Sequence, residues 1–164
     1  MTVFDRCELC GSSVDLHDRH VRFRSPDPVL DAGEIPAPDV WMTHHDANTS
    51  VMMQVNHIGA FVRALLPVHL TAGHIITYGV WVGVSPDELR RIFDTWWSPE
   101  YKDLVAEGRL ANAIAPWGLL GVPLTLRVLD PDQTPYCVGS VDDRLQSVLT
   151  KEWDHELVLS TIAD

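Results

Sequence analysis

The amino-acid sequence predicts an α+β fold, an antiparallel sheet of about five strands with two or three packed helices and a small N-terminal segment resembling a metal knuckle. Three observations carry this prediction. Apolar residues alternate between residues 51 and 84, helical spacing begins at residue 85, and two cysteines stand close together near the start. A length of 164 residues, 46% of them hydrophobic, suits one compact domain.

The alternating stretch predicts three antiparallel strands with short breaks at residues 56–59 and 71–73. The second break ends in glycine, which favours a type I turn followed by a left-handed residue. Folding the chain there pairs residues whose numbers sum to 144, so Val62 faces Val82 and the neighbouring pairs on that face are also apolar. We expect this face to be the core.

The opposite face of the same two strands is predicted to hold a ligand groove lined by Arg63, Trp81 and Gly79. An arginine over an indole gains roughly 0.5–2 kcal/mol, and a strand glycine marks close approach by a ligand or another backbone. The alternative is that a helix or loop covers this face, with Trp81 as ordinary core and Arg63 reaching to water.

A helix is predicted next, because Ser85-Pro86-Asp87-Glu88 has the composition of a capped helix start. Its apolar stripe predicts packing on the sheet rather than an aromatic binding site. The stripe consists of Leu89, Ile92, Phe93, Trp96 and Trp97. Ser98-Pro99 then predicts a restart as a second short helix.

A second hairpin is predicted from residues 122–128 and 134–138, which alternate in polarity on either side of a turn rich in Asp and Pro. Ser140 and Asp143 are predicted to cap a final amphipathic helix.

Composition divides the chain into three parts. Residues 1–24 form a zinc-knuckle-like segment, residues 25–39 form a connector, and residues 40–164 form the α+β domain. The connector holds four prolines and four acidic residues with no basic residue, so we expect it to be extended.

The first part holds the ligands of a predicted structural zinc site: Cys7, Cys10, His17 and His20. Two thiolates and two imidazoles suit tetrahedral zinc. His44 or His45 could replace either of the other histidines. A redox disulfide between the two cysteines, or a pair of unbound thiols, are the alternatives.

The net charge, the apolar stretches and the cysteines indicate which partners and which cellular compartment to expect. A formal charge of −11 opposes binding to nucleic acid and to anionic membranes. No signal peptide or membrane-spanning apolar stretch is visible, and three cysteines do not make a disulfide framework. The sequence therefore predicts a cytoplasmic protein, and it leaves the oligomeric state and the small-molecule or protein partner open.

Several motifs resemble one bacterial family. The motifs are Cys7-x-x-Cys10-Gly11, Phe61-Val62-Arg63, Leu66-Pro67-Val68, and Gly79-Val80-Trp81-Val82 with Ser85 and a tryptophan at 96 or 97. They are similar to those of the domain of unknown function 2199. This chain has Val14 where the family pattern has a histidine, and the resemblance implies no activity.

The leading hypothesis is a cytoplasmic, non-catalytic binding or interaction protein, stapled by zinc, whose groove takes a small anionic molecule or a peptide. The alternative is a small-molecule enzyme that uses His44, His45 or Cys137 in a pocket walled by tryptophans. A third class, an acidic protein that neutralises a basic partner, is compatible with the charge.

Overall fold

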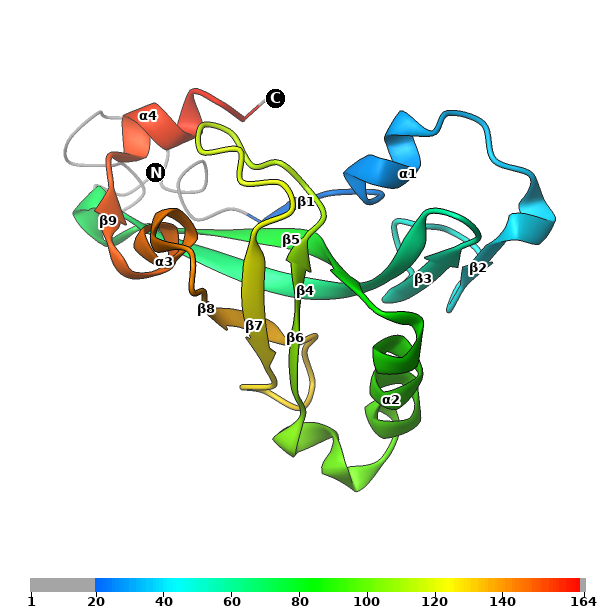
Figure 1. Cartoon of the computed structure of the whole chain (residues 1–164). Helices are drawn as coiled ribbons and strands as arrows, with labels where there is room; N and C mark the ends of the chain where they lie inside the picture. Colours follow the sequence, from blue (N-terminus) through cyan, green and yellow to red (C-terminus); the bar gives the residue numbers. More distant parts are fainter. Residues whose placement is uncertain (1–19, 163–164) are drawn as a thin grey trace, which may run out of the picture.

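Five strands close into a barrel at the centre of the molecule (Figure 1). The computed structural model describes residues 20–162. The ring consists of β4 (Gly59–Leu70), β5 (Ile75–Val84), β6 (Val105–Leu110), β7 (Pro123–Arg127) and β8 (Tyr136–Gly139). Neighbouring strands are antiparallel, except that β8 closes the ring by a parallel pairing of Tyr136 with Leu65. The α+β prediction is confirmed, and the sheet is a barrel rather than an open layer.

The predicted β4–β5 hairpin has the predicted register. Val62 pairs with Val82 and Leu66 pairs with Tyr78, and all four side chains are buried. The alternation of apolar residues therefore identified both the strands and the face that forms the core.

The turn between these strands differs from the predicted type I turn. Ala72 and Gly73 both have positive φ, 65° and 77°. Two consecutive residues of this kind are typical of the mirror-image turns that match the twist of a hairpin. A hydrogen bond from the backbone N–H of Leu70 to the carbonyl of His74, 2.8 Å long, keeps the paired numbers summing to 144.

Four further strands extend the sheet beyond the ring. β3 (Met52–Val55), the first of the three predicted strands, pairs with β4, and β2 (Val40–Met42) forms the edge beside it. β1 (His20–Arg22) lies parallel to β5, and β9 (Glu152–Trp153) lies parallel to the end of β4. The described residues thus carry nine strands, more than the five expected.

The longest helix is α2 (Pro86–Trp96), whose predicted cap is confirmed because the Ser85 hydroxyl accepts from the N–H of Glu88. It is followed by the predicted short helix, the 3-10 turn η5 (Pro99–Asp103). The final predicted helix is α3 (Asp143–Thr150), and its cap is Asp142 instead of the predicted Ser140 and Asp143.

Two short helices were not predicted. α1 (Asp27–Asp31) lies in the segment expected to be extended, and it tolerates the prolines because they stand at its start. α4 (His155–Leu159) follows β9. None of the helices in residues 20–162 is long and apolar enough to cross a membrane.

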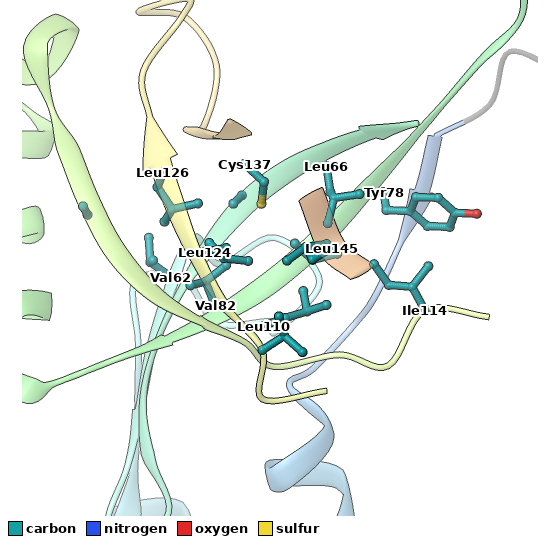
Figure 2. Close-up of a cluster of buried hydrophobic side chains, with 14 of the residues drawn as sticks. Val62, Leu66, Tyr78, Val82, Leu110, Ile114, Leu124, Leu126, Cys137 and Leu145 are labelled. Carbon is teal, nitrogen blue, oxygen red and sulfur yellow. The ribbon is translucent and has the colours of Figure 1, made fainter. Parts of the chain in front are cut away.

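The buried side chains form two clusters, one on each face of the β4–β5 ribbon. The larger fills the barrel, where side chains from all five strands converge and α3 contributes Leu145 (Figure 2). The smaller lies on the opposite face around Phe61 and Trp81, beneath residues that include Val29 and Met42. Both faces of this ribbon are therefore covered.

Candidate functional site

The predicted contact between Arg63 and Trp81 is present. The two residues pair across β4 and β5, and the guanidinium carbon lies 4.4 Å from the centre of the indole ring. Arg63 is 1% exposed and Trp81 is 0% exposed. The pair therefore lies in the interior and does not line an open groove.

Backbone carbonyls surround the buried guanidinium of Arg63. Its donors reach the carbonyls of Ser50 (3.2 Å), Gly79 (3.3 Å), Arg24 (3.3 Å), Ala47 (3.0 Å) and, by a shorter contact, Phe23. These five bonds match the five N–H donors of an arginine. Burial, and secondarily the charge of Arg22, lower the pKa of Arg63 to about 9, which leaves it protonated at neutral pH.

Gly79 lies beside β1, where it pairs with Arg22. A Cβ atom there would lie 3.4 Å from Cγ and 3.6 Å from Cα of Arg22, on β1. These are ordinary contact distances, so Gly79 does not mark a close approach; its carbonyl accepts from the backbone N–H of Phe23 at 2.9 Å and so holds the start of the covering chain. Arg63, Trp81 and Gly79 together hold the segment from Arg22 to Ser50 against the barrel, a role that sequence pattern on β4 and β5 could not reveal because the covering chain precedes them.

The residues of the enzyme alternative lie in different environments. His44 and His45 are exposed on the loop between β2 and β3, and Asp46 on that loop accepts from the backbone N–H of Asn48 at 2.9 Å. Cys137 is buried in the barrel, and burial raises the pKa of its thiol well above the ordinary value. A thiol held protonated is a poor nucleophile. The structure does not bring these candidates together into one site.

The zinc prediction receives no support from the described residues. Cys7, Cys10 and His17 lie outside them, and His20 is an exposed residue of β1. Within residues 20–162, no group of three or more His, Cys, Asp or Glu side chains is arranged to hold a metal ion. The knuckle-like segment and its zinc staple stay a prediction.

Three exposed aromatic side chains form a chain of contacts outside the barrel. The ring centroids of Trp41 and Phe93 lie 5.8 Å apart, those of Phe93 and Trp97 lie 4.7 Å apart, and both pairs meet edge to face. Trp41 is 43% exposed, Phe93 39% and Trp97 63%. We refer to Trp41, Phe93 and Trp97 as the aromatic chain.

A groove of about 540 Å³ runs beside the aromatic chain, between α2 and the edge of the sheet formed by β2 and β3. Its lining residues are Trp41, Gln54, Pro86, Asp87, Leu89, Arg90, Phe93 and Asp94. The groove thus combines an apolar wall with two carboxylates, one guanidinium and one amide, so it offers both apolar contact and polar groups that can orient a ligand.

The apolar stripe of α2 is wider than the surface it covers. Leu89 and Ile92 are buried against the sheet, and the ring of Trp96 lies 4.9 Å from that of Tyr101. Phe93 and Trp97 lie one helical turn apart on the side of α2 that faces Trp41. The prediction that the whole stripe packs as core is therefore wrong for Phe93 and Trp97, and the signal that could have located the surface is the excess width of the stripe.

The fold and the groove define the class: a small α+β protein built on a closed five-stranded barrel, with an aromatic groove beside its one long described helix. Comparison with known families then identifies the chain. It belongs to the family described as an uncharacterized protein conserved in bacteria, the domain of unknown function 2199, whose model matches residues 6–149. This confirms the resemblance of the sequence motifs. No curated protein and no solved structure matches the chain.

Proposed function

We propose that this protein is a non-catalytic binding protein whose groove between α2 and the β2–β3 edge takes a segment of a partner protein. The observation that carries the proposal is the exposed aromatic chain beside the groove. Its members are Trp41, Phe93 and Trp97. The proposed site is separate from the Arg63–Trp81 pair, neither member of which lines this groove.

Aromatic side chains at such a surface supply binding free energy. A tryptophan or phenylalanine brings a large contact area and loses little conformational freedom, so tryptophan in particular is enriched among interface residues whose truncation costs about 2 kcal/mol or more. The edge-to-face contacts of Phe93 with both tryptophans hold the three rings in a fixed arrangement. A fixed surface lowers the entropy cost of binding.

Charge defines the partner further. Asp87 and Asp94 line the groove with Arg90, and the whole chain carries a formal charge of −11. A segment with a lysine or arginine beside an apolar anchor complements both features, since its cation contacts a carboxylate or an indole face while its anchor packs on Phe93. The proposed ligand is therefore a basic, apolar-anchored peptide segment.

Selection from a library of random peptides displayed on phage tests this function. We expect selected peptides to carry a basic residue next to an aromatic or aliphatic one. Trp97→Ala and Phe93→Ala should each weaken their binding about tenfold or more, equivalent to roughly 1.4 kcal/mol. Raising the salt concentration should weaken it further, because the charges lie at an exposed surface.

Leu157→Ala is the matched control. Leu157 is an exposed apolar residue of α4, which lies away from α2 at the other end of the molecule (Figure 1). The variant should bind the selected peptides as the unaltered protein does. Peptides that bind equally well to Trp41→Ala, Phe93→Ala and Trp97→Ala variants would show that the groove is not the binding site.

A further inference from the structure

A second hollow lies on the other side of α2, where β5 and β6 separate. It measures about 790 Å³ and is lined by both strands and by α2. Its charged lining residues are Glu88, Arg91, Glu107 and Arg109. This hollow shares no lining residue with the groove of the proposed function.

The hollow exists because β5 ends before β6 does. The two strands pair only at Val82 with Leu110 and at Gly83 with Arg109. The chain then leaves β5 and enters α2 at Pro86, whereas β6 extends from Arg109 to Val105 with β7 as its neighbour. One edge of that part of β6 is therefore without a neighbouring strand.

The register shows which backbone groups face the hollow. The N–H of Leu110 donates to the carbonyl of Val122, and the N–H of Val128 donates to the carbonyl of Leu104. Because hydrogen-bonded pairs alternate along an antiparallel ladder, the even-numbered residues of β6 direct their backbone groups to β7. The odd-numbered residues direct theirs to the other side, and at Glu107 that side is the hollow.

The two ends of this edge are already occupied. Arg109 pairs with Gly83, and the carbonyl of Val105 accepts from Nη2 of Arg91 at 2.8 Å. Between them, the N–H and C=O of Glu107 present one donor and one acceptor in line with the strand. That pattern is complementary to another extended backbone.

The floor of the hollow is shaped for close approach of strands. A Cβ atom on Gly108 would lie 2.5 Å from the carbonyl oxygen of Gly83, so only glycine fits where the two strands begin to separate. The rim carries both signs of charge, with Glu88 and Glu107 beside Arg91 and Arg109. A phosphate or another multiply charged anion would meet the two carboxylates, which disfavours an anionic small molecule.

We propose that an extended peptide segment of a partner protein adds as a short strand along β6 in this hollow, with its backbone hydrogen-bonded to the N–H and C=O of Glu107. Backbone pairing supplies the affinity, and the mixed charges of the rim accommodate a peptide with side chains of both signs. Arg91 closes the far end, so the added strand is short.

The test uses random peptides displayed on phage, with the full-length protein as bait, followed by binding measurements on the selected synthetic peptides. Glu107→Pro removes the N–H that faces the hollow and leaves the β6–β7 ladder intact, because that ladder uses the even-numbered residues. Glu107→Ala is the matched control, since it removes the carboxylate and keeps the backbone N–H. We expect a class of peptides whose binding falls about tenfold or more with Glu107→Pro and less than about threefold with Glu107→Ala.

Hydrogen exchange provides a second measurement that does not depend on the proline variant folding. Bound peptide should slow exchange of the Glu107 amide in the unaltered protein by about tenfold or more. Strand addition is wrong if no selected peptide depends on Glu107→Pro, or if the Glu107 amide exchanges at the same rate with and without peptide. Peptides that respond to Trp97→Ala and not to Glu107→Pro belong to the groove of the proposed function, so the two proposals fail separately.

Discussion

Two tryptophan-containing clusters lie on opposite faces of the sheet, one beneath the segment of residues 22–50 and one exposed to solvent. Trp81 lies beneath that segment with Arg63 against its ring, and its Nε1–H donates to the carbonyl of Arg24 at 3.2 Å. Trp41 is next to Met42, which packs in the Trp81 cluster, and it points to the other face of β2, where it and Trp97 contact Phe93 and solvent. Residue type is thus the same in both clusters; residues 22–50 cover Trp81 and make it core, whereas the aromatic chain extends past the sheet and stays at the surface.

Replacing one tryptophan of each cluster with alanine should give the largest difference in the free energy of unfolding. Trp81→Ala removes a fully buried indole and should lower the free energy of unfolding by about 3–5 kcal/mol. Trp97→Ala removes a ring that is mostly in solvent and should lower it by less than about 1 kcal/mol. Urea denaturation of both variants measures the difference. Equal losses would show that the aromatic chain is structural.

Arg63→Met should have the next largest effect. The substitution conserves much of the side-chain volume but leaves the surrounding carbonyls without their donor, and it should lower the free energy of unfolding by about 2–4 kcal/mol. Arg63→Lys should recover part of this loss, because an ammonium group has three donors on one nitrogen and cannot reach all five carbonyls. Arg127→Met, at an exposed position of β7, is the control and should change stability by less than about 0.5 kcal/mol.

Alanine substitution of two glycines compares the face covered by β1 with the strands beside the hollow. Gly108→Ala places a Cβ atom against the backbone of Gly83 and should lower the free energy of unfolding by about 1–3 kcal/mol. Gly79→Ala meets the flexible side chain of Arg22 at 3.4 Å and should cost less than about 0.5 kcal/mol. Thermal unfolding compares the two. If Gly79→Ala loses more stability than Gly108→Ala, β1 does not shift to admit the added Cβ atom.

The buried thiol of Cys137 should make the free energy of unfolding depend on pH. Burial raises the pKa of the Cys137 thiol, so the folded protein keeps this proton when the unfolded chain loses it. The unfolded state then binds fewer protons, so this thiol alone should contribute a fall of about 1 kcal/mol in the free energy of unfolding between about pH 8 and about pH 9.5. Cys137→Ala should lack this contribution. If the free energy of unfolding depends on pH in the same way in both proteins, the thiol is not responsible. The two other cysteines are present in both proteins and cancel in the comparison.

Local pattern predicted the β4–β5 register and the start of α2, because each depends on residues that are close in sequence. The strand β6 was missed, since Glu107, Gly108 and Arg109 interrupt its apolar character. The prolines around α1 predict an extended segment, although at the first turn of a helix they are compatible with helical conformation.

The candidate site was harder to predict for a physical reason. Alternation placed Arg63 opposite Trp81 correctly, but it carries no information about chain that returns over that face from residues 22–50. Helical periodicity placed Phe93 and Trp97 on the stripe of α2 correctly, but the width of the sheet beneath the helix sets how much of the stripe is buried. Both errors concern which side chains are buried by parts of the chain distant in sequence, and neither concerns the local conformation.

The central position of the β4–β5 hairpin has a kinetic consequence. Its partners come from both directions along the chain: β1 and β3 precede it, and β6, β8 and β9 follow it. During synthesis the hairpin therefore emerges with two apolar faces, and Leu65 meets its neighbour Tyr136 only after most of the chain has been made. Contacts this distant in sequence slow folding, so the nascent hairpin is the segment most in need of protection from aggregation before the ring closes.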